Sequence, residues 1–187
     1  MHIKHAQSGF SVLELMIVLF LFGLLGAFVV PNLFRTKQGV ERKEFLSSFE
    51  TLIKDSVARS ISHNQMHQIF IDIAHEVIQT RVYDPQSIEV NQHKKFTPLV
   101  DFEYVTSIPF LKRFHIKNFF INGIDEVTPG NAMQDVSFYI MPDGTSQAII
   151  ANIVDEDEDG QVQDVQYSFV INPFYARMSV HEAFQTP

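Results

Sequence analysis

The chain has 187 residues, of which 45% are hydrophobic and 19% charged, and its formal net charge at pH 7 is −8. This composition excludes an intrinsically disordered chain and favours a folded domain. The acidic balance argues against a nucleic-acid backbone as the partner, and the absence of cysteine excludes disulfides, cysteine-ligated zinc and thiol nucleophiles.

The N-terminal region consists of a short polar stretch followed by a long apolar one. Residues 1–9 carry Lys4 and lack an apolar run. Residues 10–34 are apolar apart from three side chains, Ser11, Glu14 and Asn32. A helix of this length crosses a hydrocarbon core of about 30 Å at about 1.5 Å per residue. We therefore predict a transmembrane helix at 10–34. The preceding segment 1–9 is not a secretory signal peptide, because its small residue Gly9 precedes the apolar run.

Glu14 is the one ionisable side chain inside the apolar segment. A carboxylate within a membrane costs roughly 2.5–3.5 kcal/mol on insertion scales, and less near the interface, so an acid at this place indicates a function and needs a partner. The alternative is an ordinary signal anchor that happens to contain a glutamate. We favour the functional interpretation, with the partner charge on another protein, because intramembrane acids are rare.

The run Ser8-Gly9-Phe10-Ser11-Val12-Leu13-Glu14-Leu15-Met16-Ile17-Val18 resembles the N-terminal signature of the type IV pilin and pseudopilin family. The resemblance implies that prepilin peptidase removes residues 1–9 as a leader by cleaving between Gly9 and Phe10, and that Phe10 becomes a methylated N-terminus. It also implies that Glu14 pairs with the free amine of the next subunit. That pair would offset the burial of both charges and set the axial register of a filament.

Two residues of the predicted span are expected to disturb its helix. Pro31 removes a backbone hydrogen bond and clashes with the preceding turn, so a kink is predicted there. Gly23 lies near the middle of the span, and the resemblance places bends at such positions. The alternative is that glycine and proline are simply commoner in membrane helices.

Residues 35–62 are predicted to extend this helix as an amphipathic segment. Apolar and small side chains recur there at helical spacing, and charged side chains fill the opposite face. The predicted buried stripe consists of Phe45, Phe49, Leu52, Ile53, Ser56, Val57, Ser60 and Ile61.

Residues 63–187 are predicted to form an antiparallel β domain, because the hydrophobic period changes to two. Ile69 to Ile73 and Val77 to Tyr83 should form a hairpin, and residues 84–98 a loop. Further strands are predicted at 99–105, 113–121, 136–141, 146–154, 165–171 and 174–180. The last four should be antiparallel neighbours, with 148–154 a central strand covered on both faces.

The fold class predicted is therefore α+β, with a long N-terminal helix packed on antiparallel sheet. Residues 138–150, with an aromatic strand, a Pro-Asp-Gly turn and an apolar strand, resemble the C-terminal signature of the H-type minor pseudopilins. The lack of cysteine agrees with a pseudopilin or minor pilin, since major type IV pilins usually close a C-terminal loop with a disulfide.

Asp155, Asp157, Asp159 and Gly160 form a D-x-D-x-D-G pattern, which is typical of the start of a calcium loop. The bidentate acid expected at the twelfth position is replaced by Gln166. Two interpretations stay open, a calcium site and an acidic solvent-exposed loop between two strands.

The remaining polar patterns offer no catalytic site. Arg113, His115 and Lys117 form a basic row, which is either the wet side of a sheet or a docking surface for an acidic neighbour. His63 and His67 stand four apart without the acid of a metalloprotease motif, and we expect both to be exposed. The sequence thus predicts a protein that is not an enzyme.

The resemblance implies a minor pseudopilin of a type II secretion system, or alternatively a minor type IV pilin. The implied partners are other major and minor pseudopilins, prepilin peptidase and the inner-membrane assembly platform. The implied location is the bacterial inner membrane, with one span and a periplasmic C-terminal domain. Basic residues after the span outnumber those before it and predict the opposite orientation, but a dedicated leader is the more specific feature.

Overall fold

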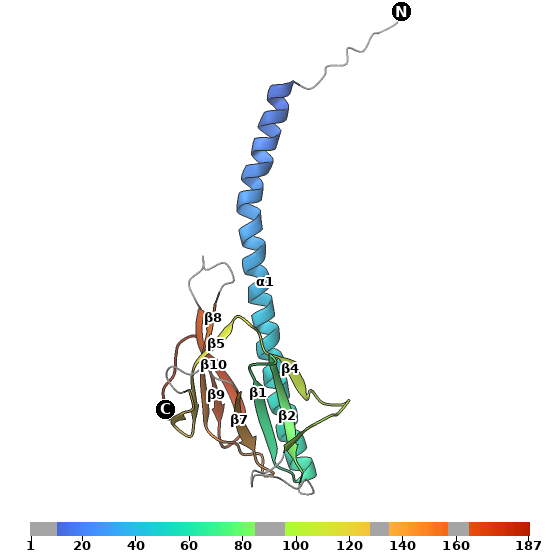
Figure 1. Ribbon diagram of the computed structural model, residues 1–187, viewed down its shortest axis with the longest axis vertical. Coiled ribbons are helices and arrows are strands. Elements are labelled where there is room, and N and C mark those ends of the chain that lie inside the picture. The colour runs from blue at the N-terminus through green and yellow to red at the C-terminus, as the bar shows by residue number, and fades with distance from the viewer. Residues whose placement is uncertain (1–10, 85–95, 128–134, 157–164) are drawn as a thin grey trace, which may run out of the picture. The chain divides into compact units, whose positions relative to one another are not determined.

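The computed structural model describes residues 11–84, 96–127, 135–156 and 165–187, without the side chains of residues 28–38. It divides into two units, residues 1–43 and residues 44–187. One helix and ten strands are described, all strand pairs among them being antiparallel. This confirms the predicted α+β class (Figure 1).

Helix α1 spans Val12–His63 without interruption, so Gly23 and Pro31 both lie inside it. In the part of the chain that the structure describes, no helical stretch combines the length and hydropathy required of a membrane span. The predicted span at 10–34 extends beyond that part, because Phe10 and the side chains of residues 28–34 lie outside it. The kink at these residues stays a prediction.

The second half of α1 forms one wall of the core of the 44–187 unit. The helical spacing correctly identified the buried stripe, in which Phe45, Phe49, Leu52, Ile53, Ser56 and Ser60 are buried. Ile61 was wrongly included, since its side chain is 53% exposed at the end of the helix. The two buried serines replace apolar contacts by hydrogen bonds: Ser56 Oγ lies 2.8 Å from Thr80 Oγ1, and Ser60 Oγ donates to the Met141 carbonyl at 2.6 Å.

The first sheet lies against this helix (Figure 1). Its path is β3-β2-β1-β7, and β4 also pairs with β2. The strands are β1 (His67–Asp72), β2 (Val77–Tyr83), β3 (Phe96–Pro98), β4 (Ser107–Pro109) and β7 (Asp135–Ile140). β1 and β2 form the predicted hairpin, with Ile69 opposite Thr80.

The second sheet has the order β10-β9-β8-β5-β6. Its strands are β5 (Phe114–Ile121), β6 (Ile124–Asp125), β8 (Ile149–Asp155), β9 (Val165–Asn172) and β10 (Arg177–His181). β8 lies between β9 and β5, and five of its seven residues are buried. It is the central strand that its apolar sequence predicts.

Three predictions for the segment between β2 and β5 were wrong. Residues 99–105 are not a strand, and residues 96–98, assigned to a loop, form β3. Residues 107–109, predicted to separate two strands, form β4 instead. Both strands are three residues long and end in proline, which cannot donate to a sheet ladder and is tolerated at a sheet edge. Such short edge strands leave little periodic signal.

The last four strands were predicted as antiparallel neighbours, and this is confirmed for β8, β9 and β10 but was wrong for β7. β7 pairs with β1 in the first sheet, while β8 pairs with β5 and β9 in the second. The two strands share only the isolated bridge between Ile140 and Ser146. The turn between them is held by α1 through the Ser60–Met141 bond, and Ser146 N–H donates to the Pro173 carbonyl at 2.8 Å, so the chain passes from one sheet to the other.

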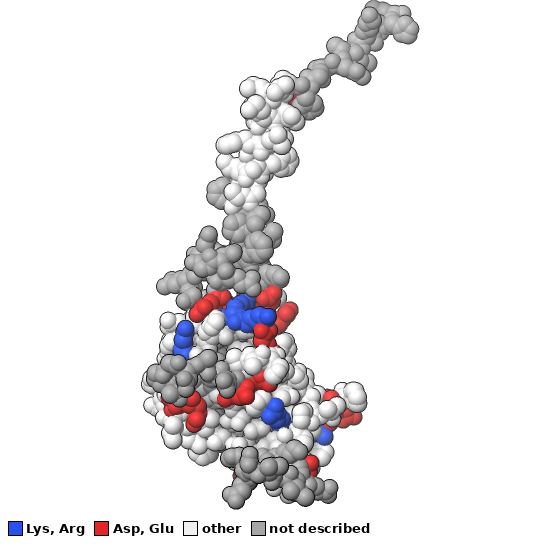
Figure 2. Space-filling model, viewed as in Figure 1, with Lys and Arg blue, Asp and Glu red and all other residues white. Residues whose placement is uncertain are grey.

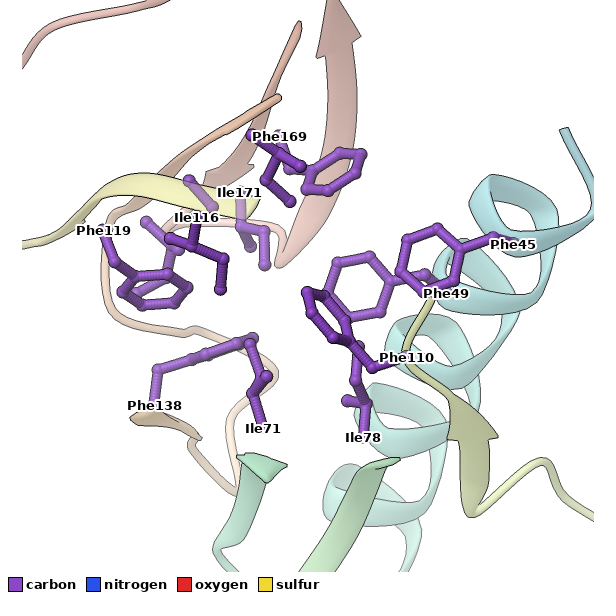
Figure 3. Close-up of a pocket in the computed structure, with 13 residues that line it drawn as sticks. Phe45, Phe49, Ile71, Ile78, Phe110, Ile116, Phe119, Phe138, Phe169 and Ile171 are labelled. Atoms are coloured by element: carbon purple, nitrogen blue, oxygen red, sulfur yellow. The ribbon is translucent and has the colours of Figure 1, made fainter. Parts of the chain in front are cut away.

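Aromatic side chains join the helix and the sheets in one core. Phe45 contacts Phe114 edge to face with ring centroids 5.0 Å apart, and Phe119 of β5 lies 6.5 Å from Phe138 of β7. Figure 3 shows Phe45, Phe119 and Phe138 among the side chains around a void of about 20 Å³ with an apolar lining. The void is far smaller than the roughly 300–1,000 Å³ of a ligand pocket, and an apolar cavity of this kind stays dry.

Candidate assembly surface

The described N-terminal end of α1 is capped by Ser11. The backbone N–H of Glu14 donates to Ser11 Oγ at 3.1 Å, and the N–H of Leu15 donates to the Ser11 carbonyl at 3.2 Å. Ser11 is therefore the N-cap residue, and Glu14 is the third residue of the helix. A carboxylate in this first turn is favoured by the positive end of the helix dipole. The backbone position of Glu14 is thus fixed locally, whatever its side chain binds.

Ser11 was not among the predicted functional residues, although its cap has a sequence signature. A serine followed three residues later by glutamate, just before an apolar run, is the signature of a capping box. Ser11-Val12-Leu13-Glu14 fits that signature, so the pattern would have identified Ser11 as a positioning residue for Glu14.

Around Glu14 the helix surface is apolar and exposed on every side. The large apolar side chains from Val12 to Leu25 are all exposed, and Figure 2 shows this segment almost free of charge. A helix that is apolar all round is normally buried, either in a membrane or in a larger protein core. Exposed apolar surface of this extent marks an interaction site. Glu14 is the only charged group available to position a partner on residues 11–27.

Several predicted site residues cannot be placed. Gly9 and Phe10, assigned to leader cleavage and N-methylation, lie outside the described residues, as do Asp157 and Asp159 of the acidic loop. Leader cleavage and N-methylation therefore stay predictions, as does the calcium site. Over the described ranges, no group of three or more His, Cys, Asp or Glu side chains is arranged to hold a metal ion.

Asp155, the first acid of the loop, is described, and it forms an ion pair. Its Oδ1 lies 2.8 Å from Nε of Arg113, and both side chains are only 9% exposed. A carboxylate that is buried beside a guanidinium has its charge already compensated. This pairing favours the interpretation of the segment as an acidic loop, because a calcium ion would compete with Arg113 for the first of its ligands.

The basic row is also paired within the domain. His115 Nε2 lies 3.2 Å from Glu156 Oε2, and Lys117 Nζ lies 3.6 Å from Glu156 Oε1. These side chains are roughly half exposed, so each pair adds little stability. They nevertheless neutralise the row that the sequence suggested as a docking surface, since the acids come from the neighbouring end of β8.

The expectation that both histidines are exposed was wrong for His67. His63 is exposed at the end of α1, but His67 of β1 is fully buried, and its Nδ1 lies 3.0 Å from the Ser56 carbonyl. Burial, which disfavours the imidazolium, lowers the pKa of His67, although the hydrogen bond to Ser56 opposes that shift.

Comparison with known proteins gives two independent kinds of similarity. Residues 4–30 match the prokaryotic N-terminal methylation motif, a segment that includes Gly9, Phe10 and Glu14. The chain is 39% identical to type II secretion system core protein G of Aeromonas hydrophila over 49 residues, 26% of this chain and 34% of that protein. It is 37% identical over 49 residues to core protein G of Klebsiella michiganensis. The match spans about a third of the length of these relatives.

The fold resembles that of a solved structure, the minor pseudopilin EpsH from the type 2 secretion system of Vibrio cholerae. The TM-score is 0.51, and the match covers 75% of this chain and 95% of that one. At 12% sequence identity the likeness concerns the fold alone. It agrees with the arrangement described above, an N-terminal helix packed on antiparallel sheets.

Proposed function

We propose that this chain, which belongs to the type IV pilin and pseudopilin family, is a minor pseudopilin of a type II secretion system, closest to the H type. Its role is structural, and it is not an enzyme. The observation that carries the proposal is the position of Glu14, a single acid in the first turn of an exposed apolar helix and inside the methylation motif.

The N-terminal helix would work as the assembly element. Cleavage after Gly9 leaves Phe10 as the N-terminus, next to the capping residue Ser11. The cap fixes the backbone of Glu14, so its carboxylate is held at a defined place on the helix. In an apolar filament core an unpaired carboxylate is costly, and pairing with the amine of a neighbouring subunit offsets that cost only in one axial register. The charge therefore selects the register, while the apolar surface supplies the contact area.

The assignment to the secretion pseudopilus draws on two similarities. The fold is like that of EpsH, a minor pseudopilin, and the short matched segment is like core protein G. Support for a minor subunit of the H type comes from the fold, from the Pro-Asp-Gly turn at 142–144 and from the lack of cysteine. A minor type IV pilin is the alternative, because its N-terminal helix would have the same design.

The location and partners follow from the same proposal. The precursor would be anchored in the bacterial inner membrane by residues 10–34, with the 63–187 domain in the periplasm. Its partners would be other major and minor pseudopilins, prepilin peptidase and the inner-membrane assembly platform. Nucleic acid is not among them, because the net charge of −8 would repel phosphates.

Deleting the gene in its own host tests this function. A secretion pseudopilin predicts that proteins normally exported across the outer membrane accumulate in the periplasm, while surface pili and twitching are unchanged. Complementation with the wild-type chain should restore export. Normal export together with loss of pili or of DNA uptake would instead identify a minor type IV pilin.

A further inference from the structure

The segment between β3 and β4 presents apolar side chains to solvent. Phe102 is 101% exposed and Val100 is 79% exposed, although each would gain from burial. We call residues 99–106 the anchored loop, because its backbone is fixed to the domain at both ends. Thr80 of β2 makes both bonds: its carbonyl accepts from Leu99 N–H at 2.9 Å, and its N–H donates to the Thr106 carbonyl at 2.8 Å.

The middle of the anchored loop is held by α1. Arg59 pairs with Asp101, and its guanidinium lies 5.6 Å from the ring centroid of Tyr104. Asp55 accepts a hydrogen bond from Val105 N–H at 2.8 Å. These contacts fix the chain on both sides of Phe102, whose own side chain is exposed. A bulky aromatic side chain held in a fixed, exposed position is pre-organised for binding, because little conformational entropy remains to be lost.

On another side of α1 the domain carries a groove of about 350 Å³. We call it the helix groove. Its floor is apolar, with Ile53 and Val57 from α1 and Met178 from β10. Its rim carries the exposed Ala58, Tyr175, Arg177 and the Lys54–Glu50 ion pair, which joins Lys54 Nζ to Glu50 Oε1 at 2.7 Å. The groove is large enough for an aromatic side chain.

The anchored loop and the helix groove carry opposite charges. Next to Phe102 the loop carries the exposed Glu103, whereas Asp101 is already paired with Arg59. At the rim of the groove Arg177 is an exposed cation. Docking Phe102 on the apolar floor would therefore bring Glu103 toward Arg177, a contact that favours one orientation over others.

We propose that the anchored loop of one copy docks in the helix groove of a second copy, with Phe102 as the anchor. Arg59 and Ala58, which belong to the two surfaces, differ in direction by about 100° around α1, so the loop and the groove are two different surfaces of one copy. The proposed contact does not rest on the assignment to secretion.

A single aromatic anchor gives weak binding in dilute solution. The contact therefore matters where another interaction already holds the copies together, such as the apolar helix surface around Glu14, because tethering raises the effective concentration. Cross-linking within assembled full-length chains is the appropriate measurement. Because the chain has no native cysteine, only the introduced cysteines can form a disulfide.

Two single-cysteine variants of the full chain, Val100→Cys and Ala58→Cys, would be mixed in detergent and oxidised. We expect a disulfide-linked heterodimer, since docking brings the loop to the rim of the groove. Val100→Cys mixed with Ile124→Cys is the matched control, because Ile124 is exposed on β6, at the opposite edge of the second sheet from β10. Equal yields with Ala58→Cys and with Ile124→Cys would overturn the proposal.

Two further substitutions separate docking from random collision. Phe102→Asp, in the Val100→Cys background, should lower the yield about tenfold without changing the melting temperature, because the side chain is fully exposed. Glu103→Lys should also lower the yield, and Arg177→Glu in the groove-bearing chain should restore it. A yield that Phe102→Asp leaves unchanged, or a charge reversal that rescues nothing, would contradict the proposed contact.

Discussion

Asn152 exchanges two hydrogen bonds with the backbone of Gln185. Asn152 Nδ2 donates to the Gln185 carbonyl at 3.0 Å, and the Gln185 N–H donates to Asn152 Oδ1 at 3.1 Å. Asn152 is buried in the central strand β8, so its amide is satisfied by the chain that lies over it. Ser168 Oγ also donates to the Ala183 carbonyl at 3.0 Å. The C-terminal segment thus covers one face of the second sheet.

Asn152→Ala is therefore expected to lower the free energy of unfolding by about 1–3 kcal/mol, since it leaves two backbone groups of Gln185 without their partner. Denaturant titration of the full chain measures the change. Gln185→Ala is the control, because it keeps both backbone groups and should cost much less. Equal losses for the two variants would show that the reciprocal bonds are not what holds the C-terminal segment.

Stability should fall in acid because of His67. Its pKa is lowered by burial, with Arg59 and His63 adding repulsion, so the folded state binds fewer protons than the unfolded state. The stability that the neutral ring contributes is complete above its unfolded pKa of about 6.5 and is lost as the pH falls through the lower folded value. We expect the melting temperature to decrease between about pH 7 and pH 5.

His67→Gln should flatten that pH dependence, because glutamine can still donate to the Ser56 carbonyl but does not titrate. His115→Gln, at a half-exposed position, is the control and should keep the wild-type slope. The same slope in His67→Gln and in the wild type would assign the acid sensitivity to other groups.

Gly144 is required at the turn between the two sheets for two reasons. Its φ is +85°, and a Cβ there would lie 2.9 Å from Cδ1 of Ile61 on α1. Gly123 has the same kind of backbone, with φ +86°, but a Cβ would meet its nearest neighbour only at 3.7 Å.

Gly144→Ala and Gly123→Ala should both cost about 1–2 kcal/mol from the left-handed backbone. Gly144→Ala should cost more, because Ile61 must also move. Thermal unfolding of the two variants measures this difference. A smaller loss for Gly144→Ala would mean that the approach of the helix end does not constrain the turn.

Calcium is expected to leave the thermal midpoint unchanged, since Arg113 already compensates Asp155. Melting curves in millimolar calcium and in chelator test this directly. A midpoint raised by several degrees in calcium, and not in magnesium, would establish the cation site that the D-x-D-x-D-G pattern suggests.

The parts of the fold that the sequence predicted have a strong local period. The stripe from Phe45 to Ser60 is one example, because its buried positions recur at helical spacing. The β1–β2 hairpin is another, because buried and more exposed positions alternate along most of its two strands. The assignment of β7 and β8 to different sheets was not predictable from Pro142 to Thr145, whose composition suits a hairpin. The choice is made by contacts with α1 and with the Pro173 carbonyl, which are distant in the sequence.

In the candidate site, too, local features could be predicted from the sequence, whereas contacts between distant residues could not. Glu14 was found from the sequence because a single acid in an apolar run is unusual. The pairing of Asp155 with Arg113 and the burial of His67 depend on strand neighbours that only the fold brings together. The cap formed by Ser11 was local and predictable, and it supplies the variant that separates helix formation from assembly.

In the proposed function the charge of Glu14 directs assembly. Glu14→Gln removes the charge but keeps a residue that suits the capping box, whereas Ser11→Ala weakens the cap and keeps the charge. The most direct measurement is co-purification of each full-length variant with neighbouring pseudopilins, with folding checked by circular dichroism. We predict that Glu14→Gln folds normally and no longer co-purifies, while Ser11→Ala still does. Undiminished co-purification of Glu14→Gln would contradict this role of the charge.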